Sequence, residues 1–145
     1  MKKNLIVMLV LISFLFVGCG PSKGSLLPNK VDFNVDLMPM TSESIVTQDG
    51  VKIYFRYTGA RQVTIDNERG IIKTDLGDCD LISVTNLDSE GNTFLNGQTG
   101  VFDFSCNSEI LSGDTIEGDI VGVSLINPNS GIERTINGTV RLGIN

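Results

Sequence analysis

The sequence has no histidine and no tryptophan among its 145 residues. Histidine is the usual general base near neutral pH and the commonest metal ligand, so its absence argues against acid–base and metal-dependent catalysis. Basic residues are also scarce, with 11 Lys and Arg against 17 Asp and Glu and a net charge of −6. Nucleic acid and anionic lipid headgroups both require a basic surface, so neither is expected as a partner, and no cofactor is predicted.

Apolar residues at helical spacing are missing from every long segment. Glycine is frequent, and Val, Ile and Thr dominate the ordered segments, which is typical of an all-β chain. We therefore predict an antiparallel two-sheet β-sandwich with immunoglobulin-like features. Because the tryptophan of antibody-type domains is absent, the prediction concerns the architecture and not that family.

The N-terminus combines Lys2 and Lys3 with an apolar run of about 13 residues, from Leu5 to Val17. This run is shorter than the roughly 20 residues of a spanning helix, and a basic start before a short apolar core is typical of an export signal. The segment that follows resembles a prokaryotic lipoprotein lipobox, although Phe stands where Leu is usual: Phe16-Val17-Gly18-Cys19. A retained anchor and an ordinary cleaved signal are the alternatives.

The lipobox resemblance implies that the Cys19 thiol is lipidated and that cleavage makes Cys19 the new N-terminus. Residues 1–18 are then the signal peptide, residues 19–29 a flexible Gly/Ser/Pro-rich tether, and residues 30–145 the β domain. Cleavage removes two lysines and leaves 9 basic residues against 17 acidic ones. The expected location is the cell envelope, lipid-anchored to a membrane, with the domain outside the cytoplasm.

Two further cysteines, Cys79 and Cys106, are most simply paired as a disulfide in an exported chain. The loop of about 27 residues that they close corresponds to roughly 3.5 kcal/mol on the chain-entropy model. Free thiols or metal ligands are the alternative, weakened by the lack of histidine and of a short C-x-x-C spacing. Because Cys106 shares a face with the inward Phe102 and Phe104, we expect the bridge to cross the core.

Eight or nine strands are expected, several of them alternating. Residues 31–37 should form one strand ended by Pro39, and residues 51–58 a second with a buried face. In residues 116–126 the inward set changes phase, from Ile116 and Ile120 to Val121, Val123 and Leu125, which predicts a β-bulge near Gly122. Residues 86–100 are turn-rich, and the last strand covers 132–144 with Ile132 inward.

Turn and strand signatures recur along the chain in these segments: Val46 to Val51, Gly97 to Gly100, Phe104 to Cys106, Ser112 to Asp114, Gly118 to Ile120, Ser130 to Ile132 and Asn137 to Val140. Together they cover about two-thirds of the chain after the signal and resemble archaeal pilin-like β domains, in which a cysteine strand, a Ser-Gly-Asp turn, a long strand and a Gly-Thr-Val ending recur in order. Pilins keep a long N-terminal helix, whereas this chain has a lipobox and a short tether. The resemblance implies a sandwich and a surface role.

Three groups of residues are candidates for binding or chemistry. Carboxylates around Cys79 could hold a cation or act as an acid–base pair, although a solvated turn is the simpler interpretation: Asp75, Asp78 and Asp80. Part of the turn-rich segment resembles half of an EF-hand loop, but its twelfth position is glycine instead of the required glutamate: Asn86, Asp88, Glu90, Gly91 and Gly97. One outward strand face could form a contact patch or simply be solvated: Lys52, Tyr54 and Arg56.

The function expected from the sequence is binding or structural packing by a lipid-anchored envelope domain, without catalysis. Its partners would be the membrane, through the lipid on Cys19, and an envelope or extracellular protein that the sequence does not identify. A pilin-like filament or surface-appendage subunit is the alternative. An envelope hydrolase that uses carboxylates is a third hypothesis, resting on Asp75, Asp78 and Asp80.

Overall fold

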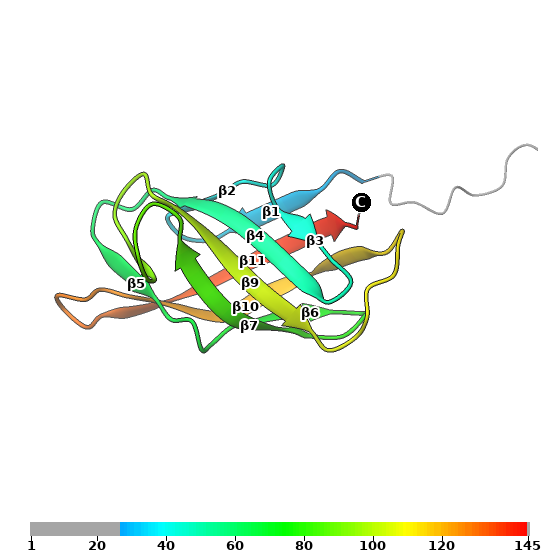
Figure 1. Cartoon of the computed structure of the whole chain (residues 1–145). Helices are drawn as coiled ribbons and strands as arrows, with labels where there is room; N and C mark the ends of the chain where they lie inside the picture. Colours follow the sequence, from blue (N-terminus) through cyan, green and yellow to red (C-terminus); the bar gives the residue numbers. More distant parts are fainter. Residues whose placement is uncertain (1–26, 145) are drawn as a thin grey trace, which may run out of the picture.

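The protein is described by a computed structural model over residues 27–144, which contain β-strands and no helix (Figure 1). Cys19 and most of the predicted tether lie outside the described residues. The eleven strands are β1 (Lys30–Phe33), β2 (Leu37–Pro39), β3 (Ile45–Val46), β4 (Gly50–Tyr57), β5 (Val63–Ile65), β6 (Ile71–Thr74), β7 (Cys79–Asn86), β8 (Thr93–Phe94), β9 (Thr99–Cys106), β10 (Thr115–Ile126) and β11 (Glu133–Gly143).

All the strand pairs are antiparallel, and their ladders join into one sheet. The order is β1-β11-β10-β6-β7-β9-β4-β2, with β3 also beside β4 and with β5 linking β10 to β8. The edge strands β1 and β2 are consecutive in the chain and lie close together, so the sheet curves nearly into a barrel (Figure 1). The predicted all-β antiparallel class is confirmed, while a division into two separate sheets is not confirmed by this pairing.

Strand β4 shows how the sequence pattern builds the core. Its four inward residues are at most 1% exposed, because alternate side chains of a strand point to opposite faces. Phe55 stacks on Phe102 of β9 with ring centroids 4.4 Å apart, and it contacts Phe94 of β8 at 5.3 Å. The predicted inward face of β4 is confirmed: Val51, Ile53, Phe55 and Tyr57.

The predicted β-bulge in β10 is confirmed. Ile120 lies opposite Gly138 of β11 and Val123 lies opposite Ile136, so β10 has one extra residue between them. Gly122 occupies a left-handed conformation with φ of 78°, which glycine adopts without a steric penalty. The expected inward position of Val121 is wrong: this residue precedes the extra one, pairs with Ile71 of β6 and is half-buried.

The strand predicted over residues 31–37 is divided into β1 and β2. The Asn34 N–H donates to the Asn137 carbonyl, while the Asn34 Oδ1 accepts from the Asn137 N–H, so a side chain replaces the next ladder carbonyl. The Leu37 N–H then donates to the Val35 carbonyl at 2.6 Å, which closes a tight turn. The chain thereby leaves β11 and joins β4 across the gap between the two sheet edges.

One assignment of the sequence prediction is wrong, and two buried residues were not predicted. Residues 86–100 contain the short strand β8, whose Phe94 is fully buried, and the loop residue Ile110 is also buried. Ile132, predicted to face inward, is 65% exposed. It precedes β11 at the tip of the β10–β11 hairpin, where the Asn127 N–H donates to its carbonyl beyond the end of the core.

Cys79 and Cys106 form the predicted disulfide, with their Cα atoms 3.8 Å apart. The bridge does not cross the core, because the two residues lie directly opposite each other on the neighbouring strands β7 and β9. Cys79 is fully buried and Cys106 is half-buried against the core. The bridge therefore fastens two paired strands at one end of the barrel.

The barrel has two distinct ends. β1 begins and β11 ends at one of them, called here the terminal end, where the disulfide also lies (Figure 1). The far end carries the last residue of β4, the loop after it and the tip of the β10–β11 hairpin (Figure 1). Antiparallel pairing fixes this separation, because Lys30 faces Arg141 while Leu37 faces Tyr57.

Candidate functional site

The carboxylates singled out in the sequence are not brought together into a site. Asp75, Asp78 and Asp80 are all exposed, in and beside the turn that precedes β7. Throughout residues 27–144, no group of three or more His, Cys, Asp and Glu side chains is placed to hold a metal ion. The solvated turn, which was the simpler interpretation of the sequence, describes these three residues.

The EF-hand-like segment uses its polar atoms to hold its own loop. The Asn86 Oδ1 accepts from the Asp88 and Ser89 N–H groups, and its Nδ2 donates to the Thr93 carbonyl. The Asp88 carboxylate accepts from the Thr99 N–H at 2.6 Å. These oxygens therefore stabilise the connection between β7 and β9.

The outward face of β4, a candidate contact patch in the sequence, has one of its two basic side chains in an ion pair with β9. The Lys52 Nζ lies 3.1 Å from the Asp103 carboxylate of β9, and Tyr54 is half-buried. Arg56 is exposed and forms no ion pair with another residue of the described chain.

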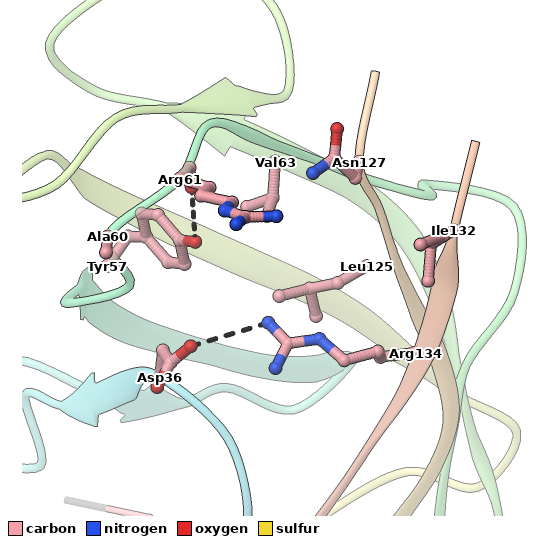
Figure 2. A pocket seen from close by; sticks show the side chains of 9 residues that line it. All are labelled: Asp36, Tyr57, Ala60, Arg61, Val63, Leu125, Asn127, Ile132 and Arg134. Carbon is pink, nitrogen blue, oxygen red and sulfur yellow. Dashed lines mark hydrogen bonds and ion pairs between the residues drawn. The ribbon is translucent and has the colours of Figure 1, made fainter. Parts of the chain in front are cut away.

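A hollow of about 340 Å³ opens at the far end of the barrel, and we call it the distal hollow (Figure 2). Its walls come from the β1–β2 connection, the end of β4, the loop after β4 and the β10–β11 hairpin, which are far apart in the sequence. Nine residues line it: Asp36, Tyr57, Ala60, Arg61, Val63, Leu125, Asn127, Ile132 and Arg134.

Tyr57 fixes the loop that forms one wall of the distal hollow. Its ring is 1% exposed, and its hydroxyl donates to the Arg61 carbonyl at 2.6 Å. Gly59 lies against the ring so closely that a Cβ there would be 2.1 Å from the Tyr57 hydroxyl oxygen. The hydrogen bond and this contact hold residues 58–61 around the phenol and place Arg61 at the rim.

Burial raises the pKa of the Tyr57 phenol above its ordinary value, the Asp36 carboxylate raises it further, and Arg134 partly offsets both effects. The charged phenolate is poorly solvated in this position, and a nearby negative charge disfavours it as well. Tyr57 is therefore protonated over the whole physiological pH range. It remains a hydrogen-bond donor to the Arg61 loop.

Two arginines face the distal hollow from opposite walls. The Arg134 Nη2 atom lies 3.4 Å from the Asp36 carboxylate, an exposed ion pair of small energetic value. Arg61 forms no ion pair within residues 27–144. Figure 2 shows the two guanidinium groups on either side of the Leu125 side chain.

The chemistry of the distal hollow follows from these parts. Its charged residues are two arginines and one aspartate, so its formal charge is positive within a chain of net charge −6. Val63 and Leu125 provide an apolar floor, and the exposed Ile132 forms part of the rim. The arrangement suits a ligand that carries an anionic group next to an apolar one.

Sequence reasoning did not find this site, because Asp36 and Arg134 are 98 positions apart and come together only through the barrel. One local signal was present. Tyr57 stands at the inward end of an alternating strand just before Gly59, and a buried tyrosine hydroxyl usually finds a hydrogen-bond partner. Such a signal points to a fixed loop but not to its arginine.

Comparison with known proteins identifies no relative: no protein-family model, curated protein or solved structure matches this chain. Among the residues that the structure describes, no helix is long and apolar enough to cross a membrane.

Proposed function

We propose that this protein is a lipid-anchored component of the cell envelope whose β domain binds a partner at its far end and performs no catalysis. The observation that carries the proposal is the polarity of the barrel. β1 begins at the terminal end, whereas the distal hollow lies at the far end (Figure 1). A chain held by Cys19 would therefore turn the distal hollow away from the membrane.

Binding accounts better than acid–base chemistry for the residues of the distal hollow. Its single carboxylate, Asp36, is paired with Arg134, and the raised pKa of Tyr57 keeps its phenol protonated. The protonated phenol is therefore not prepared to accept a proton from a substrate. An exported β domain with a loop-lined hollow at one end is also a common arrangement for recognition.

We also infer that the barrel-shaped sheet is a variant of the immunoglobulin-like sandwich. β11 and β10 lie behind β4, β9 and β7 in Figure 1, and Phe33 of β1 contacts Phe102 of β9 across the interior with ring centroids 5.9 Å apart. The chain passes from one layer to the other between β1 and β2.

Anchoring is tested by replacing the proposed lipidation site. In a prokaryotic host, Cys19→Ser should move the protein from the membrane fraction to the soluble fraction, whereas Ser22→Ala, a matched change after the cut, should leave it in the membrane. Intact mass spectrometry of the wild-type protein should give a chain that begins at Cys19 and carries lipid. Membrane retention of Cys19→Ser would contradict the anchor.

Presentation of the far end requires its own test. Exposed loop tips tolerate insertion, so an epitope can be placed in the turn 127–131. It should be accessible to antibody on intact cells or on cells stripped of their outer layers, because this turn would face away from the membrane. An epitope in the turn 75–77, near the disulfide at the terminal end, should be less accessible. Equal accessibility of the two epitopes would contradict the proposal that the far end faces away from the membrane.

Filaments seen by electron microscopy, together with a mass that retains residues 1–18, would favour the pilin-like alternative.

A further inference from the structure

We propose that the distal hollow binds the free C-terminal carboxylate of a partner polypeptide whose last side chain is aliphatic. This inference rests on the proposed function, because it names the chemistry of the partner that the far end would meet.

The positive charge of the distal hollow complements a carboxylate. Arg61 has no ion-pair partner in the described chain, and Arg134 offers only one of its nitrogen atoms to Asp36, at 3.4 Å. A guanidinium carries five N–H donors, so most of the donors at the distal hollow are available. Guanidinium groups bind carboxylates through two parallel hydrogen bonds, and such charge-assisted bonds are roughly twice as strong as neutral ones.

The loop that carries Arg61 is held in place before any ligand binds. The Tyr57 hydroxyl holds the Arg61 carbonyl at 2.6 Å, and Asn96 donates through its Nδ2 to the Thr58 and Gly59 carbonyls. One anchor is the last residue of β4 and the other lies in the connection between β8 and β9. A ligand therefore meets an arginine whose backbone does not have to be ordered on binding, which reduces the entropic cost of association.

The apolar residues beside the arginines favour a ligand with an aliphatic side chain over an acidic sugar. Val63 and Leu125 form a buried floor, 4% and 1% exposed, and Ile132 stands 65% exposed at the rim, so the apolar surface that a ligand can cover next to the arginines is mainly that of Ile132. A sugar ring would place hydroxyl groups against Ile132, where they would lose water without gaining a hydrogen-bond partner, which is costly. An aliphatic side chain gains roughly 25 cal/mol for each Å² of apolar surface removed from water.

The volume agrees with a short terminal segment. About 340 Å³ is at the lower end of the range for small-molecule sites, roughly 300–1,000 Å³. It accommodates one or two residues and not a long peptide. Capture of a chain terminus by its carboxylate is a recognised mode of peptide binding.

The test uses the full-length protein in detergent and the dipeptide N-acetyl-Ala-Leu as the probe, with binding followed by calorimetry or by amide NMR shifts. The acid should bind, and its C-terminal amide should bind at least tenfold more weakly. Affinity for the acid should also fall as salt is raised, since the arginines are exposed to solvent. Equal binding of acid and amide would overturn the proposal.

Three variants assign the effect to the distal hollow. Arg61→Gln should weaken acid binding roughly tenfold or more, while Arg56→Gln on the outer face of β4 should leave it unchanged. Asp36→Asn should strengthen binding, because it frees Arg134 and removes a like charge. Thermal unfolding should confirm that all three variants fold. Unchanged affinity in folded Arg61→Gln would contradict the site, as would weaker binding by Asp36→Asn.

Competing anions identify the ligand class. Glucuronate and inorganic phosphate should displace the dipeptide only at much higher concentration, and displacement by either at equal concentration would overturn the peptide assignment. Failure here is distinguishable from failure of the anchor. If the Cys19→Ser variant moves to the soluble fraction but the wild-type protein does not bind N-acetyl-Ala-Leu, the lipid anchor is supported and the proposed ligand class is wrong.

Discussion

At the scale of single residues, Tyr57 links the core to the candidate site. Its ring belongs to the buried face of β4, while its hydroxyl holds the loop that carries Arg61. The side chain has an apolar body and a polar tip, so one residue serves packing and loop geometry together. The two tyrosines of the chain, Tyr54 and Tyr57, lie on opposite faces of β4 and allow the two roles to be compared.

Tyr57→Phe should keep the core filled and lose the hydrogen bond to the Arg61 carbonyl. We expect a decrease in the free energy of unfolding of about 1 kcal/mol and weaker binding of N-acetyl-Ala-Leu, because the Arg61 loop is no longer held. Tyr54→Phe is the matched control and should change neither quantity by a comparable amount. Urea unfolding and calorimetry measure the two effects. Equal losses in both variants would contradict the loop-holding role.

The raised pKa of Tyr57 predicts a dependence of stability on alkaline pH. The folded state keeps the phenol proton above the ordinary tyrosine pKa of about 10, whereas the unfolded state releases it. Stability from this group is therefore complete below about pH 10 and is lost as pH rises toward the folded pKa. Urea unfolding between pH 9 and pH 11 should show this loss in the wild type and Tyr54→Phe. An unchanged slope in Tyr57→Phe would contradict the assignment.

At the scale of elements, the length of a strand decided whether the sequence could predict it. The alternation in β4 spans 8 residues and the phase change in β10 lies within 12, so face and bulge were both predictable. β8 has only 2 residues, too few for a period-2 pattern to be seen. The division of residues 31–37 was not predictable, because it depends on Asn137, more than 100 positions away.

The bulge in β10 predicts a ranking of substitutions at Gly122. With φ at 78° and no heavy atom within 4 Å of a Cβ added there, space is available and only the backbone conformation resists a side chain. Asn tolerates this conformation, whereas a β-branched residue does not. We expect Gly122→Val to lower the free energy of unfolding by roughly 1–2 kcal/mol more than Gly122→Asn does. Equal effects would show that the bulge relaxes at no cost.

At the scale of the whole molecule, the barrel joins its first and last strands. Lys30 of β1 faces Arg141 of β11, so the sheet is complete only when nearly the whole chain is present. The curvature of this sheet brings Asp36 to Arg134 and forms one wall of the distal hollow. This is the physical reason that the sequence predicted strands and a disulfide but not the site: local periodicity does not report which distant residues a curved sheet brings together.

The disulfide offers the final prediction, because it lies at the opposite end of the barrel from the distal hollow. Its loop, with a sequence separation of 27, should contribute about 2–4 kcal/mol, largely through the unfolded state. Reductant should therefore lower the urea midpoint of the wild-type protein, and the double variant Cys79→Ala/Cys106→Ala should be less stable and insensitive to reductant. Where the double variant remains folded, its affinity for N-acetyl-Ala-Leu should be unchanged. A reductant-insensitive wild type would contradict the stabilising role of the bridge, and an altered affinity would show that the two ends of the barrel are coupled.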